Sequence, residues 1–147
     1  MSTNTASDWY ADSLRQIDQA LYDSRTGFPV SIELGGQAYQ FAIWQGEQLP
    51  DRLLAFDTET AAIQDREIPQ LALATVYGDR GSGYFIHPAN LAQFIRQHNQ
   101  AHFVCHNAPF DFWTTAAALQ SDPQALGCWW DVAGDSRLCC TMLFDQL

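Results

Sequence analysis

Lysine is absent from this sequence of 147 residues. Its seven basic residues are all arginines, and they stand against seventeen aspartates and glutamates, which gives a formal net charge of −10. Tight binding to phosphate backbones normally comes from clustered lysine and arginine side chains. The composition therefore argues against a protein that binds nucleic acid by charge alone. Phosphate chemistry at this surface would need metal ions to reverse the local charge.

The sequence also has no C-x-x-C cysteine motif and no long apolar run. The four cysteines show no C-x-x-C spacing, which argues against a zinc site or a disulfide framework and favours reduced thiols in a cytoplasmic protein. The first ten residues have neither a basic start nor an apolar core, so we expect no secretory signal. No apolar run approaches the roughly 20 residues of a membrane span, and we expect no membrane partner. The cysteines are Cys105, Cys128, Cys139 and Cys140.

What is present suits one packed domain with an extension in front of it. Hydrophobic residues make up 47% of the chain, which is typical of a globular protein. Residues 1–50 combine a helical apolar spacing over 8–22 with two short strands around Gly35-Gly36, a hairpin signal. We therefore divide the chain into this helix and β-hairpin extension, residues 1–50, and a second unit, residues 51–147.

The second unit has the pattern of an α/β fold. Three strand-like segments come first, then a helix, a buried strand and another helix, which predicts a mixed sheet whose early strands form an antiparallel meander. A loop follows, and a last helical pattern begins near residue 136. The chain stops inside that pattern, so we expect the domain to be C-terminally incomplete. The predicted strands are 53–57, 68–79, 83–88 and 102–107, and the helices are 90–98, 109–119 and 136–147.

Two carboxylates close the first of these strands, in the stretch LLAFDTET. Because alternate side chains of a strand share a face, Asp57 and Glu59 point the same way while Thr58 points opposite. Two acids this close repel each other unless a cation or a proton lies between them. Their position at the carboxyl end of a strand that we expect to be buried on both faces is where open α/β sheets bind ligands. Oxygen ligands of this kind suit Mg²⁺ or Mn²⁺.

A second motif follows the strand at 102–107, in HFVCHNAPFDFW. Asn107 is a suitable N-cap and Pro109 fits the first turn of the helix that follows. Asp111 then lies in that first turn, near the mouth of the sheet. It could complement the helix dipole, but its shared location with Asp57 and Glu59 favours a metal site completed by all three acids.

These two motifs, FDTET and HNAPFDFW, resemble the first two motifs of the DEDD 3′–5′ exonucleases. The similarity extends over residues 52–147 and is greatest to the proofreading domain of family A, polymerase I-like, DNA polymerases of bacteria and phages. It implies a ribonuclease H-like mixed sheet with flanking helices. The implied activity is hydrolysis of nucleotides from the single-stranded 3′ end of DNA, beside a polymerase domain in a longer parent protein.

The resemblance also assigns roles to individual residues. Two Mg²⁺ or Mn²⁺ ions activate a water and stabilise the leaving 3′ oxygen in such enzymes. By similarity Asp57 bridges both ions, while Glu59 binds one ion and contacts the terminal 3′-hydroxyl. Asp111 ligates the second ion. The expected substrate contacts are Thr58 and Phe110, which line the terminal nucleotide, and Asn107, which shapes the turn beneath it.

One family feature is missing, and it keeps other interpretations open. The third motif, Y-x-x-x-D or H-x-x-x-D, does not occur before Leu147, and Asp131 and Asp135 lack the Tyr or His partner. His106 could stand in for the missing group, although a histidine at a strand end is the more ordinary interpretation. The chain could therefore be a non-catalytic remnant that binds metal or nucleic acid weakly. A dehalogenase-like phosphatase, which also begins with an acid after a strand, fits less well because it needs a later basic residue and a late acidic pair.

Overall fold

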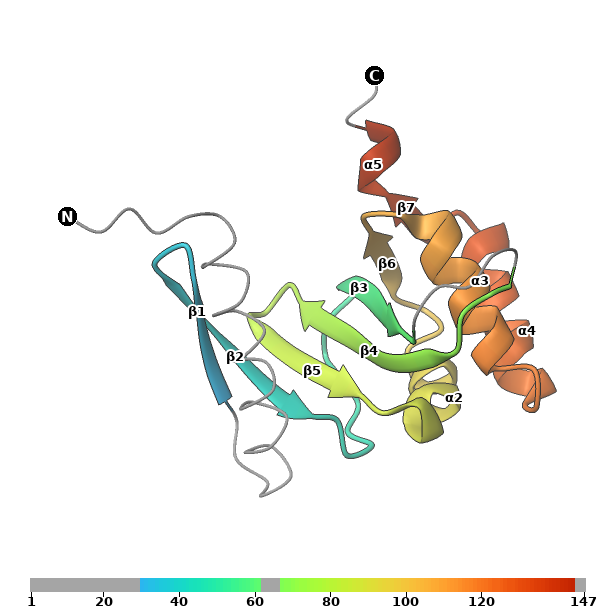
Figure 1. Ribbon diagram of the computed structural model, residues 1–147, viewed down its shortest axis with the longest axis horizontal. Helices are drawn as coiled ribbons and strands as arrows, with labels where there is room; N and C mark the ends of the chain where they lie inside the picture. Colours follow the sequence, from blue (N-terminus) through green and yellow to red (C-terminus); the bar gives the residue numbers. More distant parts are fainter. Residues whose placement is uncertain (1–29, 62–66, 145–147) are drawn as a thin grey trace.

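The computed structural model describes residues 30–61 and 67–144, which form a mixed sheet of seven strands and four helices (Figure 1). The fold is thus α/β, as the sequence predicts. The helix predicted over residues 8–22 lies outside the described residues. The strands are β1 (Val30–Leu34), β2 (Gln37–Ile43), β3 (Leu53–Thr60), β4 (Leu71–Gly78), β5 (Ser82–Ile86), β6 (His102–Cys105) and β7 (Leu138–Cys140). The helices are α2 (Pro88–Gln97), α3 (Ala108–Ala118), α4 (Pro123–Gly134) and α5 (Thr141–Phe144).

The strands follow the order β1-β2-β5-β4-β3-β6-β7 across the sheet. β3, β4 and β5 form the predicted antiparallel meander, and β6 lies parallel to β3 on its other side. The strands of Asp57 and Val104 are thus neighbours, and those of Tyr77 and Phe85 lie farther out. The hairpin β1–β2 joins the same sheet, because β2 pairs with β5. A segment that we assigned to a separate extension therefore continues the sheet.

The turn of that hairpin follows from two glycines. Gly35 and Gly36 both have positive φ, 59° and 80°, as the two-residue turn favoured between right-twisted strands requires. Residues other than glycine, asparagine and aspartate adopt that backbone conformation with difficulty. The predicted hairpin around this pair is confirmed, with Leu34 paired to Gln37 across the turn.

One face of the sheet carries the hydrophobic core, and we call it the covered face. α2 packs on β4 and β5, and α3 packs on β3 and β6. α4 contacts α2 and sends the Trp129 ring among Phe56, Phe103 and Phe112, with ring centroids 5.4 to 5.9 Å apart. The helices gather together at the β3–β6 side of the sheet, away from the hairpin (Figure 1). Leu54 and Phe103 supply other fully buried side chains of this face.

The opposite face of the central strand is exposed, which corrects an expectation. We expected residues 53–57 to be buried on both faces, but burial along β3 alternates strictly. Leu54, Phe56 and Thr58 lie on the covered face, while Leu53 is 46% exposed. The expectation failed because an apolar run does not say how many layers cover it. We call the face with Leu53, Ala55, Asp57 and Glu59, together with the residues paired beside them, the open face.

The C-terminal third corrects two further expectations. The stretch interpreted as a loop around Asp122 forms α4, because the Asp122 carboxylate caps it by accepting from the Ala125 amide at 3.0 Å. The helix predicted from residue 136 is wrong at Leu138–Cys140, which forms β7 and pairs parallel with β6. A short apolar segment satisfies helical spacing, but here pairing with a neighbouring strand decides its conformation.

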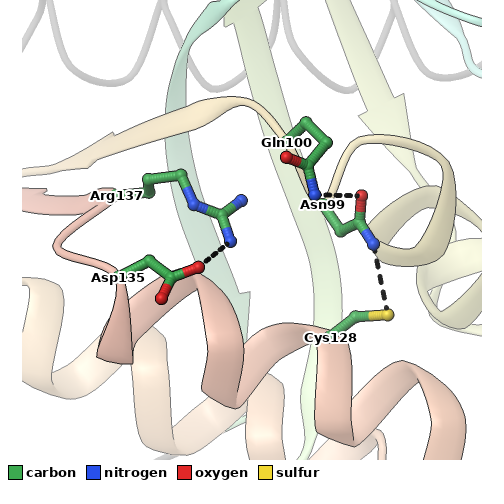
Figure 2. A network of polar contacts seen from close by, with 5 residues as sticks. All are labelled: Asn99, Gln100, Cys128, Asp135 and Arg137. Atoms are coloured by element: carbon green, nitrogen blue, oxygen red, sulfur yellow. Dashed lines mark hydrogen bonds and ion pairs between the residues drawn. The ribbon is translucent and has the colours of Figure 1, made fainter.

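Polar contacts hold the helices to the strands that follow them. Arg137, at the start of β7, pairs with Asp135 at the end of α4 at 2.8 Å. Asn99, in the turn before β6, donates to the Cys128 thiol of α4 and accepts from Gln100 (Figure 2). Together with the ion pair between Arg96 of α2 and Asp122, these contacts join α2 and α4 into one layer. Within this layer, α2 packs on β4 and β5.

Candidate functional site at the ends of β3 and β6

Asp57 and Glu59 extend from the last half of β3 toward the open face. Both side chains are exposed, and the Thr58 side chain between them is 6% exposed on the covered face. The predicted shared orientation of the two acids is confirmed, and its cause is the two-residue period of a strand. β6 pairs with β3 only as far as Ala55 and Val104. Beyond that point the edge of β3 is free to receive other groups.

Asp111 fills that free edge. It lies in the first turn of α3, and the helix follows β6 directly. Its Oδ1 atom accepts a hydrogen bond from the Thr58 amide at 3.0 Å and another from the Thr58 hydroxyl at 2.7 Å. A carboxylate from a helix therefore replaces the strand partner that the Thr58 amide lacks. The side chain is 1% exposed, which explains why two donors are needed to hold it there.

Both Asp57 and Asp111 have a raised pKa, and the charge of Asp57 contributes to the shift of Asp111. Partial removal of water raises the pKa of Asp57, while the Thr58 amide and the nearby His106 act in the opposite direction. Burial raises the pKa of Asp111, the Thr58 hydroxyl lowers it, and the charge of Asp57 raises it again. A carboxylate whose pKa is raised by a second carboxylate binds a proton or a cation more readily than one that stands alone.

The second carboxylate oxygen of Asp111, Oδ2, differs from the first in its surroundings. Its Oδ2 atom is buried and has no hydrogen-bond partner of standard geometry among the described residues, and the Cys105 thiol is the group placed to donate to this carboxylate. The Cys105 thiol lies nearby, and its pKa is raised by burial and by the charges of Asp111 and Asp57. The thiol stays protonated and is no metal ligand in that state. The free oxygen fits a divalent cation shared with Asp57.

The described residues contain no group of three or more His, Cys, Asp or Glu side chains already gathered around a point where an ion would fit. Asp57 and Asp111 meet around Thr58, and Glu59 lies one step along the open face. The predicted sharing of one ion by all three acids therefore stays a prediction.

The three predicted substrate residues lie around this site in different environments. The Thr58 hydroxyl is turned to Asp111 and away from the open face. Asn107 occupies the N-cap position of α3 without a side-chain cap; its carbonyl accepts from the Phe110 and Asp111 amides at 2.9 and 3.2 Å. Phe110 is half-buried and lines an apolar groove of about 700 Å³ with Ile68 and Trp113, among others. This groove is a suitable place for a flat apolar group.

The sequence named His106 only as a possible stand-in for the missing group and did not place it beside Asp57. His106 is exposed and lines a cleft of about 350 Å³ on the open face together with Asp57, Thr141 and Tyr77. The signal was present in the sequence: Asp57 and His106 come at the same point of two strands that run parallel. It could be used only once the register between those strands was known.

Comparison with protein-family models, with curated proteins and with solved structures finds no match for this chain. None of the helices in residues 30–61 and 67–144 has the length and apolar character needed to cross a membrane. The functional argument therefore depends on the sequence motifs and on the geometry of the site.

Proposed function

We propose that this chain carries a 3′–5′ exonuclease domain of the DEDD type, with a ribonuclease H-like sheet, that removes nucleotides from the 3′ end of single-stranded DNA. The observation that carries the proposal is the meeting of Asp57 and Asp111 around the Thr58 amide. Two motifs 54 positions apart in the chain come together at one sheet edge, where the resemblance requires them. The strand order around β3, with an antiparallel β4 and a parallel β6, supports the same proposal.

In this proposal, divalent ions bound at the site supply the positive charge that activates water and stabilises the leaving oxygen. The role of the chain's own residues is to hold these divalent ions. Asp57 faces both the open face and Asp111, Glu59 faces the incoming strand, and Asp111 presents its free Oδ2 atom. The groove beside Phe110 takes the terminal base by stacking, which binds every base to a similar degree. Since the formal charge of the chain is −10, we expect binding of DNA to depend strongly on the divalent ion.

A second candidate function is a remnant that binds metal without catalysis. It is favoured by the absence of a Y-x-x-x-D or H-x-x-x-D motif and of a ready three-ligand cluster in the described residues. Loss of one ligand in a two-metal site costs orders of magnitude in rate, since the reacting oxygens are no longer held in line. The two candidates thus differ in turnover and agree in metal binding.

The test is stepwise shortening of a 5′-labelled single strand, with Mg²⁺ or Mn²⁺, by the native chain and by Asp57→Ala. Asp79→Ala is the matched control, because Asp79 is an exposed acid in the turn after β4. For an exonuclease we expect stepwise shortening from the 3′ end that falls by at least about 100-fold in Asp57→Ala and is unchanged in the control. Mn²⁺ binding that needs Asp57, without any shortening, would establish the remnant instead.

A further inference from the structure

A row of polar side chains crosses the open face over β4 and β3 and continues just beyond the ends of β6 and β7. Asp57 of β3 is paired directly with Thr75 of β4. On the other side of β3, the last pair with β6 joins Ala55 to Val104. Asp57 comes two residues later on β3, and His106 comes just after the end of β6; both line one cleft on the open face. Asp57 and His106 are therefore neighbours that both point to the open face.

The same reasoning adds a fourth member. β6 and β7 pair as far as Cys105 and Cys140, so the next residues of each chain segment are His106 and Thr141. A hydrogen bond 3.0 Å long joins His106 Nδ1 to Thr141 Oγ1. The row thus reads Thr75, Asp57, His106, Thr141, and its four members line one cleft.

The imidazole of His106 is fixed in this row from two directions. Its Nδ1 atom is held by Thr141, and its backbone carbonyl accepts from the Met142 amide at 3.0 Å and from the Cys140 thiol at 3.4 Å. Its Nε2 atom makes no hydrogen bond within the described part of the chain, although the ring lines the cleft that also holds Asp57. A histidine anchored through Nδ1, with Nε2 free in a cleft beside a carboxylate, has the arrangement of a metal ligand whose outer partner sets the tautomer.

We propose that Asp57 and His106 bind a divalent transition-metal ion of the Zn²⁺ type on the open face. Asp57 gives a carboxylate oxygen, and His106 gives Nε2 while its Nδ1–H donates to Thr141. Carboxylates alone suit Mg²⁺ and Mn²⁺, whereas an imidazole nitrogen shifts the preference toward Zn²⁺. With two protein ligands, the remaining positions belong to water or to a substrate oxygen. As a statement about binding the inference is independent of nuclease activity; as a statement about the nuclease metal it rests on the proposed function.

The test is calorimetric titration of the untagged full chain with Zn²⁺ in the presence of a non-thiol reductant. His102→Asn is the matched control for His106→Asn, since His102 lies on the same strand and is also exposed, but at the opposite end of β6. We expect His106→Asn and Asp57→Asn to weaken Zn²⁺ binding at least tenfold, and His102→Asn to leave it unchanged. Thr141→Val removes only the outer partner and should weaken binding by about tenfold.

Nitrogen NMR of the histidine imidazoles tests the same site independently, because it reports the tautomer of each ring and whether Zn²⁺ binds to it. The free protein should show His106 as the Nδ1–H tautomer, and Zn²⁺ should shift its Nε2 resonance but not the resonances of His102. Folding of each variant is checked by its thermal unfolding midpoint. Zn²⁺ affinity that is unchanged in His106→Asn, or an unshifted His106 resonance at saturation, would overturn the inference and place the ion on the cysteine thiols.

The two proposals fail in different ways. If Mn²⁺-dependent shortening of DNA requires Asp57 but the affinity for Zn²⁺ does not depend on His106, the nuclease proposal is supported and the Zn²⁺ inference is wrong. If Zn²⁺ binding requires Asp57 and His106 while DNA is never shortened, the Zn²⁺ inference is supported and the nuclease proposal is wrong.

Discussion

The covered face and the open face of this sheet are built from the same strands, yet they do different work. On the covered face, residues such as Leu54, Phe56 and Phe103 are almost fully buried under α2, α3 and α4. On the open face, Asp57 and His106 stand among exposed or half-buried side chains. Only one residue position separates the two environments along β3. The alternation of a strand thus lets one segment serve the core and the candidate site together.

The difference shows where stability and chemistry reside. Apolar burial scales with the area removed from water, so the covered face contributes most of the free energy of folding. Charged groups are tolerated on the open face because water still reaches them. Asp111 is the exception: it is buried at the boundary, where its hydrogen bonds to Thr58 join the helix layer to the end of β3. Substitutions on the two faces should therefore separate into large and small effects on stability.

The largest effect is expected from Trp129→Ala on the covered face. Trp129 is 0% exposed, and its indole Nε1 donates to the Phe112 carbonyl at 3.1 Å. Removing so large a buried ring should lower the free energy of unfolding by about 3–5 kcal/mol. The neighbouring Trp130 is 49% exposed, so Trp130→Ala should cost about 1 kcal/mol or less. Urea unfolding of both variants measures the difference, and equal losses would mean that α4 does not pack as described.

A middle-sized effect is expected at the boundary, from two variants of Asp111. Asp111→Ala leaves the buried Thr58 amide and hydroxyl without an acceptor, which should cost about 1–3 kcal/mol. Asp111→Asn keeps an acceptor oxygen for both donors and removes the buried charge, so it should stay within about 1 kcal/mol of the native chain. Both variants lose the carboxylate that the proposed nuclease needs. Urea unfolding beside the DNA assay separates the two roles, and a stable Asp111→Ala would show that its bonds to Thr58 are unimportant.

A pH effect is expected on the covered side, from His98 at the end of α2. His98 Nε2 accepts from the Leu49 amide at 2.9 Å, and Nδ1 lies 2.8 Å from the Phe94 carbonyl, so the folded ring is neutral. Burial lowers the pKa of His98 below its usual value of 6.5. The unfolded chain therefore takes up this proton first as pH falls, and stability is lost below about pH 6.5, by at most about 1.4 kcal/mol per pH unit.

Thermal unfolding between pH 7.5 and 5.5 measures that loss, with His98→Gln and the exposed-site variant His102→Asn as the comparison. The slope should shrink in His98→Gln and persist in His102→Asn. The same slope in all three chains would assign the pH dependence to other groups.

The smallest effects on stability are expected on the open face. Leu53→Thr and Asp57→Asn change side chains that water already reaches, and each should shift the free energy of unfolding by no more than about 0.5 kcal/mol. Asp57→Asn should nevertheless remove the proposed activity. Denaturant midpoints near the native value for both variants would sharpen the contrast between the faces. A loss above about 2 kcal/mol for Leu53→Thr would show that some part of the chain covers the open face.

Much of the fold could be predicted from local patterns. The hairpin at Gly35-Gly36, the meander up to Ile86 and the helix after Pro88 all carry strong turn or cap signals. The segment 123–134 escaped prediction because Asp122-Pro123 reads equally well as a turn and as a helix start, and only its packing through Trp129 distinguishes them. Leu138–Cys140 escaped because three apolar residues have no period of their own, and the free edge of β6 decides their state.

The sequence by itself determined which chemistry is possible here. The order of FDTET and HNAPFDFW, and the period of two along β3, placed Asp57 and Glu59 on one face because these are local properties of the chain. Tertiary structure decided the rest. It buried Asp111 against Thr58, which lies 53 residues away in the chain, and it brought His106 beside Asp57 through the register between β3 and β6. Register is set by the packing of the whole covered face, and no short stretch of sequence contains it.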